Sequence, residues 1–189
     1  MRRGEIPGIA LDKRPYATVA IIVLSLASTL AYRSGQVNVL DLGAIYGPLG
    51  SDWWRVLAAP FIHDNAGYQF ITLVAVGVFG TALERHFGSY VTALIFLAAG
   101  AAGCGLAVAA QDYPVLGANG AALGLLAAWF IEFRMTRPDD GDVDLLGAGM
   151  FAAVLFGLSV AWQPASIVAG VGGALVGCVA GFALAQRSR

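Results

Sequence analysis

Charged residues are scarce in this sequence, and their scarcity excludes an ordinary soluble domain. They make up 12% of the 189 residues, against 58% hydrophobic residues, and the mean hydropathy is +0.74. A soluble globular domain carries about 25% charged residues. The net charge is −1, so no basic surface for a nucleic-acid partner is expected. The composition predicts a single integral membrane domain over residues 1–189, in contact with the lipid bilayer.

Cysteine is equally rare, and nothing in the sequence has the pattern of a metal site. Cys104 and Cys178 lie within apolar stretches and are interpreted as small packing residues. The acidic run over residues 139–144 lacks the spacing of a calcium-binding loop, so we interpret it as a solvated turn. We expect no disulfide, no metal and no cofactor.

Six apolar stretches have about the 20 residues that a helix needs to cross a bilayer. They cover residues 16–32, 61–83, 89–110, 118–135, 145–162 and 166–185. The first could be a signal peptide, but it is long for one and no small-residue cleavage site follows, so a retained anchor is favoured. Residues 33–60 are too polar to cross. Trp53 and Trp54 stand there beside Arg55, which predicts an interfacial, partly structured first loop.

Basic residues are distributed unevenly between the two sides that this plan creates. Six crossings place both termini on one side, and only Arg33 and Arg55 of the eleven Lys and Arg residues fall on the other. Basic residues are enriched on the cytoplasmic side of membrane proteins. Residues 1–15 are therefore expected to form a cytoplasmic tail, with both termini in the cytoplasm. The minimal six-helix plan favours a bacterial plasma membrane.

Glycines recur every four residues in the fourth and sixth apolar stretches. They are Gly120 and Gly124 in the fourth, and Gly173, Gly177 and Gly181 in the sixth. Small residues at this spacing form grooves for close helix contact in lipid, so these two helices should pack tightly. Asn119, a lone amide in this apolar region, should then face residues 169–173. An amide there is either a functional polar group, a helix N-cap or a structural hydrogen-bonding group.

An ordered set of short motifs runs through most of the chain. It comprises Trp54-Arg55, Phe61-Ile62-His63, Gly80-xxx-Glu84-xxx-Gly88, Gly117-Ala118-Asn119-Gly120-xxx-Gly124 and the ladder of Gly173 and Gly177. In this order and on six helices, the set resembles the rhomboid family of intramembrane serine proteases. The resemblance implies an all-α membrane protein, a six-transmembrane-helix rhomboid-like bundle. It also implies that Glu84 makes structural hydrogen bonds.

The resemblance fails at all four positions that carry the chemistry of the family. Its fourth span begins Gly-x-Ser-Gly, where the serine is the nucleophile, and its sixth span carries the histidine that acts as the base. Asn119 and Gly170 occupy these positions here. Counting from His63, the two oxyanion-donor positions of the second span fall on Tyr68 and Thr72. His63 itself is expected to bond loop backbone.

Acyl transfer needs a nucleophile within hydrogen-bond reach of a base, whatever the family. An amide attacks poorly, and Gly170 has no side chain to accept a proton. No second Gly-x-Ser-Gly occurs, and Ser159 and Ser166 have no histidine nearby in sequence. The other histidine, His86, should lie near the opposite membrane face from His63.

The sequence is therefore interpreted as a pseudoprotease that binds or escorts transmembrane helices of client proteins. A working intramembrane serine protease is the first alternative. A small-solute channel or transporter is the second, and the few ionisable residues within the spans disfavour it. The sequence predicts no oligomeric state.

Overall fold

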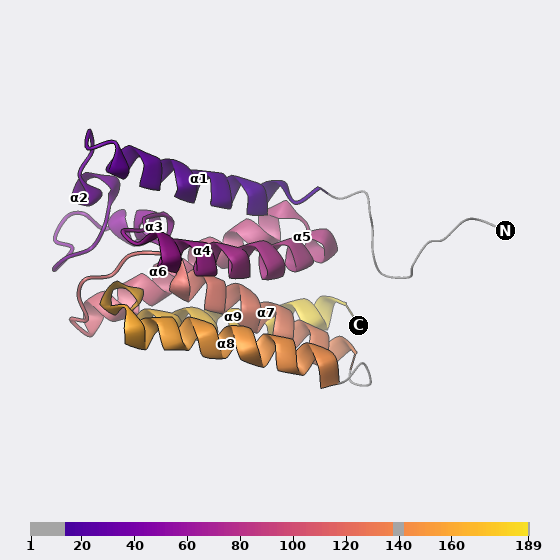
Figure 1. Ribbon diagram of the computed structural model, residues 1–189. Coiled ribbons are helices and arrows are strands. Elements are labelled where there is room, and N and C mark those ends of the chain that lie inside the picture. The colour runs from indigo at the N-terminus through magenta and orange to yellow at the C-terminus, as the bar shows by residue number, and fades with distance from the viewer. Residues whose placement is uncertain (1–13, 138–141, 189) are drawn as a thin grey trace.

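Helices make up nearly all of the regular structure in the computed structural model, which describes residues 14–137 and 142–188. The long helices are α1 (Tyr16–Arg33), α6 (Ser89–Ala109), α7 (Asn119–Thr136), α8 (Asp142–Ala161) and α9 (Ile167–Arg187). Between α1 and α6 lie the short helices α2 (Val39–Leu42) and α3 (Arg55–Ala58), the 3₁₀ turn η1 (Ala59–Phe61), α4 (Ala66–Ala75), the π-helical turn η2 (Val76–Gly80) and α5 (Thr81–Phe87). A second 3₁₀ turn, η3 (Gln163–Ala165), precedes α9. The start of α1 and the end of α9 lie at the same end of the bundle (Figure 1).

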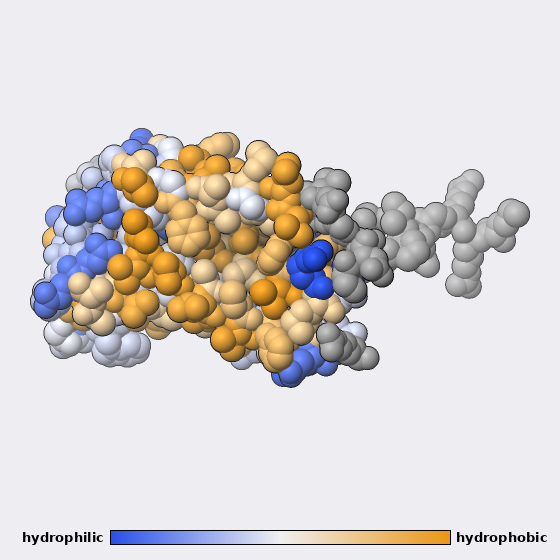
Figure 2. All heavy atoms as spheres, turned by 90° about the horizontal axis from the view of Figure 1, so that it is seen from below, coloured by the Kyte–Doolittle hydropathy of each residue, from blue (hydrophilic) through white to orange (hydrophobic). Residues whose placement is uncertain are grey.

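Several of these helices suit a bilayer. Four stretches of the described residues are long and apolar enough to cross one: Tyr16–Arg33, Ala66–Phe87, Ser89–Ala109 and Gln163–Arg187. α8 contributes a shorter apolar helix, Leu145–Ala161. Figure 2 shows apolar residues across the middle of one face of the molecule and hydrophilic residues towards its two ends. The predicted all-α, multi-pass membrane protein is confirmed at this level.

The second span begins and ends later than the prediction of 61–83. η1 includes Pro60, and the helix starts only after Asn65, whose side chain accepts hydrogen bonds from the backbone N–H groups of Gly67 and Tyr68. α4, η2 and α5 then run on to Phe87, where Gly88 ends the helix with a φ of 90°. The end of the predicted second span at residue 83 is therefore too early, because Glu84 lies inside α5.

The acidic run is described only in part. Residues 139–141 lie outside the described residues, so the predicted turn is not tested there. α8 begins at Asp142, so the backbone of residues 142–144 is helical and the turn does not extend through them as predicted.

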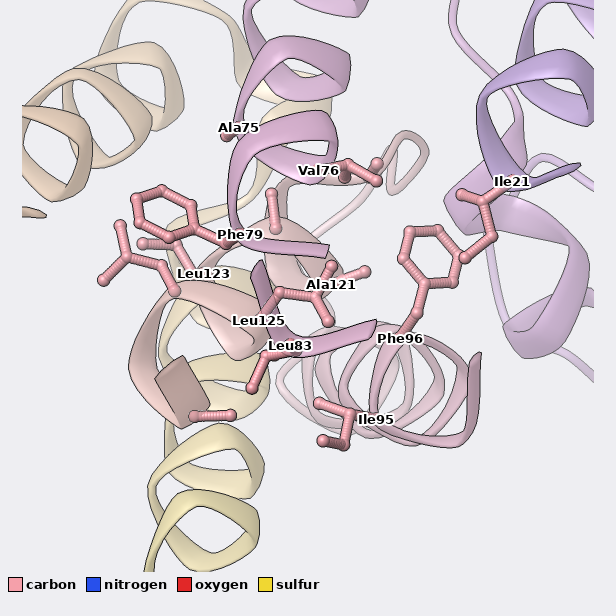
Figure 3. Packing of buried hydrophobic residues seen from close by; sticks show 14 of the residues in the cluster. Ile21, Ala75, Val76, Phe79, Leu83, Ile95, Phe96, Ala121, Leu123 and Leu125 are labelled. Atoms are coloured by element: carbon pink, nitrogen blue, oxygen red, sulfur yellow. The ribbon is translucent and has the colours of Figure 1, made fainter. Parts of the chain in front are cut away.

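α7 is the central helix of the bundle, and it packs most extensively on α9 and α6. Its side chains meet Phe79 and Leu83 from η2 and α5 and Ile95 and Phe96 from α6 in one buried apolar cluster (Figure 3). A Cβ atom on Gly173 would overlap the carbonyl group of Gly120, so α7 and α9 touch through their backbones. The predicted close packing of the fourth and sixth spans is confirmed.

Candidate functional site

The four residues before Asn119 are hydrogen-bonded to three other parts of the chain. These are the first loop, η1 with the turn that follows it, and η3. The backbone N–H groups of residues 115–118 each donate to another part of the chain. Their acceptors are, in order, the carbonyl oxygens of Ile45, Pro164 and Ala59 and the Nε2 atom of His63. The approach to α7 is thus held in place before the helix begins, and its donors are already used.

Asn119 is the first residue of α7 and is 1% exposed. Its Nδ2 donates to Ser159 Oγ at 2.8 Å and to the carbonyl oxygen of Ala165 at 2.9 Å. A Cβ atom on Gly170 would lie 3.3 Å from the same Nδ2, so Asn119 faces the start of α9 as predicted. Its side chain caps nothing, because Ala118 stands at the cap position. The N-cap interpretation is therefore wrong, and the structural hydrogen bond is right.

The oxygen of the Asn119 amide differs from the nitrogen in its hydrogen bonding. Asn119 Oδ1 is buried and has no hydrogen-bond partner among the residues that the structure describes. A buried polar atom without a partner is costly, and such atoms are rare in proteins. The start of α7 therefore holds hydrogen-bonding capacity that the described chain does not use.

The two serines near the site are engaged elsewhere. Ser159 Oγ, on α8, accepts from Asn119 and lies 3.2 Å from the carbonyl oxygen of Ala165. Ser166 Oγ donates to Asp112 Oδ2 at 2.6 Å and accepts from the N–H of Ala169. Neither hydroxyl has a hydrogen bond to a histidine.

His63 lies between the first loop and α4 and is 1% exposed. Its Nε2 accepts from the N–H of Ala118 at 3.2 Å, so the proton of the neutral ring is on Nδ1. Burial lowers the pKa of His63 from 6.5 to about 4. The imidazole is therefore neutral at physiological pH and bonds loop backbone.

Tyr68 and Thr72 lie beside this histidine on α4. The Tyr68 hydroxyl donates to the carbonyl oxygen of Leu116 at 3.1 Å. Its ring covers Gly117, where a Cβ atom would overlap the phenol and where φ is 91°. Thr72 Oγ1 lies 3.2 Å from His63 Nε2 and 2.9 Å from the carbonyl oxygen of Tyr68 in its own helix. Tyr68 thus packs against the residues that precede α7, and Thr72 packs against His63.

Glu84 joins three helices at the other end of the bundle. Its carboxylate is 1% exposed and accepts from the N–H groups of Ala17 and Thr18, each at 2.8 Å. The hydroxyls of Thr18 and Ser89 donate to it as well. The carboxylate therefore satisfies the first N–H groups of α1, which would otherwise lack acceptors. Gly80 allows this approach, because a Cβ atom there would lie 2.9 Å from Thr18 Oγ1.

The Trp54-Arg55 pair organises the first loop. Arg55 donates to the carbonyl oxygen of Ala44 at 3.0 Å and forms an ion pair with Asp52. Its guanidinium lies 5.6 Å from the centre of the Trp54 ring, which covers Gly43. Trp53 is 66% exposed, and the depth of both indoles relative to a bilayer stays a prediction.

A model of the rhomboid domain matches residues 50–187. The chain belongs to the rhomboid family. It is 32% identical over 122 residues to the rhomboid protease GluP of Bacillus subtilis, which is 61% of this chain and 24% of that protein. It is 28% identical over 141 residues to RHOMBOID-like protein 4 of Arabidopsis thaliana, or 73% of this chain and 36% of that protein. RHOMBOID-like protein 9, chloroplastic, of the same plant is 23% identical over 127 residues, 64% of this chain and 29% of that protein.

This rhomboid chain thus spans between 24% and 36% of the length of these relatives. The matched rhomboid domain begins in the first loop and takes in α3 through α9. α1 lies outside the match, although Glu84 fastens it to the rest of the bundle. Sequence reasoning missed Ser159 as the partner of Asn119. The only signal was a lone hydroxyl in an apolar stretch.

Proposed function

We propose that this rhomboid is a pseudoprotease, which binds transmembrane helices of client proteins and does not cleave them. One observation carries the proposal. Asn119 and Gly170, which stand where rhomboid proteases have their serine and histidine, lie side by side, and neither can perform the chemistry. The amide donates its Nδ2 hydrogens to Ser159 and Ala165 and presents no nucleophile. Gly170 supplies no base.

The surroundings support this proposal. An oxyanion intermediate needs free donors aimed at it, and losing one typically costs about 10²–10³ in rate. The N–H of Ala118 is already donated to His63, and that of Gly117 to Ala59. Tyr68 donates to the chain rather than into open space. All three donors are therefore used in hydrogen bonds within the chain.

A contact between Thr72 and His63 does not restore catalysis. A hydroxyl–imidazole pair is the minimum for nucleophilic attack. Thr72 is fully buried within α4, and two carbonyl oxygens of its own helix lie within 3.1 Å of its hydroxyl. The Nδ1 of His63 has no acceptor among the described residues, so no group orients the ring as a base.

We propose further that α7 and α8 also cross the bilayer, giving six crossings with both termini in the cytoplasm. They contain 18 and 20 residues, and α7 is surrounded by other helices, so its surface needs less apolar character than a lipid-facing helix. The basic residues near the ends of α5, α7 and α9 support this orientation. Similarity to a Bacillus protein supports a bacterial plasma membrane.

α8 offers a route for a client helix, because the described hydrogen bonds that tie it to other parts of the chain lie at one end. Ser159 bonds to Asn119 there, and Trp162 Nε1 donates to Asp64 at 3.2 Å. Most of its large side chains, such as Met150 at 62% and Val160 at 79%, are exposed. A client that separates α8 from α4 would meet Asn119 Oδ1, which has no partner among the described residues. A helix with weakly satisfied backbone donors gains most from such an acceptor.

Fluorophosphonate labelling and cross-linking together test this function. The unmodified protein should give no labelled serine, beside an active rhomboid protease as positive control. A photo-cross-linker at Val154 on α8 should capture a glycine-rich transmembrane peptide more than a polyleucine one, and the peptide should stay intact. The same cross-linker at Val179, on the exposed face of α9, is the matched control.

The rival function is intramembrane proteolysis, which the similarity to a named rhomboid protease favours. Cleavage of the peptide by the unmodified protein, or a labelled serine, would establish the rival. Equal capture of both peptides at both positions would remove the proposed client specificity.

A further inference from the structure

A cavity of about 230 Å³ lies at the far end of α7 from Asn119, between α5 and α7. Its wall includes Arg85, His86, Trp129, Glu132, Phe133 and Arg137. Neither the hydrogen bonds around Asn119 nor the proposed client route involves these side chains. The cavity therefore calls for an explanation of its own.

The wall of the cavity carries two arginines and one glutamate. Among the side chains that the structure describes, which do not include those of residues 138–144, Arg85 and Arg137 form no ion pair. Arg137 instead lies over the ring of Phe133, 5.5 Å from its centre. Glu132 is 6% exposed, and its Oε1 lies 4.0 Å from Nε2 of His86. Two guanidiniums beside one carboxylate complement a group that carries both a phosphate and an ammonium.

An apolar cavity of about 220 Å³ lies next to this polar one. Both share Ala82 and Trp129, and the second is lined further by Phe79, Ala148 and Phe151. Phe79 meets Phe151 edge to face at 5.2 Å, so the apolar cavity lies where α8 approaches η2. A polar compartment beside an apolar one fits an amphiphile.

We propose that the two adjoining cavities bind one membrane phospholipid. Its phosphate lies against Arg85 and Arg137, and the primary ammonium of an ethanolamine headgroup lies near Glu132. One acyl chain passes Ala82 and Trp129 into the apolar cavity. This site would hold α8 against η2 through a lipid, and it does not depend on whether the protein is an enzyme.

Native mass spectrometry of the delipidated full-length protein tests the site. Phosphatidylethanolamine, phosphatidylglycerol and phosphatidylcholine with identical acyl chains are the probes. We expect one phosphatidylethanolamine to be retained, and its apparent affinity to fall at least about tenfold in the double variant Arg85→Gln, Arg137→Gln. The matched control is Arg14→Gln with Arg187→Gln, which removes two arginines from the same end of the bundle but outside the cavity. An equal loss in the control would reduce the effect to surface charge and overturn the site.

Two further variants separate headgroup from acyl chain. Glu132→Gln should abolish the preference for phosphatidylethanolamine over phosphatidylcholine while phosphatidylglycerol is still retained. Ala82→Phe should fill the junction of the cavities and weaken all three lipids at an unchanged melting temperature. Ala82→Phe still tests the proposal if the arginine variants fail to fold. Displacement of the lipid by millimolar inorganic phosphate, or full binding in Ala82→Phe, would show an anion site without a lipid chain and refute the proposal.

Discussion

The carbonyl oxygen of Gly120 lies where a side chain on Gly173 would begin. One helical turn further on, Gly124 and Gly177 repeat the arrangement. At the next turn a Cβ atom on Gly181 would lie 2.5 Å from the carbonyl oxygen of Ala128. This backbone contact fixes the register of α7 against α9. It also brings Asn119 to the start of α9.

Replacing Gly173 or Gly177 by Leu should therefore lower the thermal stability in detergent more than replacing Asn119 by Ala. Overpacking a close contact costs about 1–3 kcal/mol or more. Losing one polar contact inside a membrane protein costs about 0.6 kcal/mol on average. Gly157→Leu on α8 is the control, because nothing lies within 4 Å of a Cβ atom there. If Asn119→Ala proved as damaging as the glycine variants, the amide would be the main structural joint.

Removing the Glu84 carboxylate should loosen α1. Glu84→Ala leaves the N–H groups of Ala17 and Thr18 without acceptors, at about 1–3 kcal/mol for each buried donor. We expect a lower melting temperature and faster hydrogen exchange at these two amides. Asp41→Ala removes an exposed carboxylate from α2 and is the control. Unchanged exchange at residues 17 and 18 would contradict the capping role.

His63 should make stability depend on pH. Its pKa is lowered to about 4 in the folded protein, from 6.5, so the unfolded chain takes up the proton first as the pH falls. The contribution of the neutral ring is complete above pH 6.5 and is lost between pH 6.5 and about 4, a change on the order of 3 kcal/mol. His63→Gln keeps an acceptor for Ala118 and removes the titration.

The free energy of unfolding, measured from pH 7 to pH 4, should thus fall less in His63→Gln than in the unmodified protein. His86→Gln replaces the only other histidine and should follow the unmodified protein. The carboxylates are common to all three proteins and cancel in the comparison. Parallel curves for His63→Gln and the unmodified protein would show that His63 does not titrate in this range.

The helical plan could be read from the sequence because lipid imposes it. Apolar stretches near 20 residues and glycines four apart are local signals, and both identified the helices and the α7–α9 contact. The start of α4 was misplaced because hydropathy counts Phe61 and Ile62 as membrane residues. The cap at Asn65 is what starts the helix, and a cap has no hydropathy signal.

The site was predictable in its chemistry and in the approach of Asn119 to the start of α9. That Asn119 and Gly170 could not form a serine–histidine pair followed from residue type alone. The bond between Asn119 and Ser159 joins residues on α7 and α8, and no local pattern marks it. The same holds for His63 and Ala118, since their pairing depends on how the first loop folds over the approach to α7.

Rebuilding the missing pair should not rebuild a protease. Asn119→Ser supplies a hydroxyl without a base, so we expect no cleavage of a labelled transmembrane substrate in liposomes and no fluorophosphonate labelling. Asn119→Ser with Gly170→His should give a trace at most. A Cβ atom on Gly170 would lie 2.9 Å from Leu123 Cδ1, so an imidazole must displace that leucine before it reaches the serine. The N–H of Ala118 would still be donated to His63 and unavailable to an oxyanion. Adding His63→Ala to the double variant frees that N–H and should raise the trace if oxyanion stabilisation is what limits it. Robust cleavage by the single variant Asn119→Ser would instead reveal a base within reach of residue 119 and end the pseudoprotease proposal.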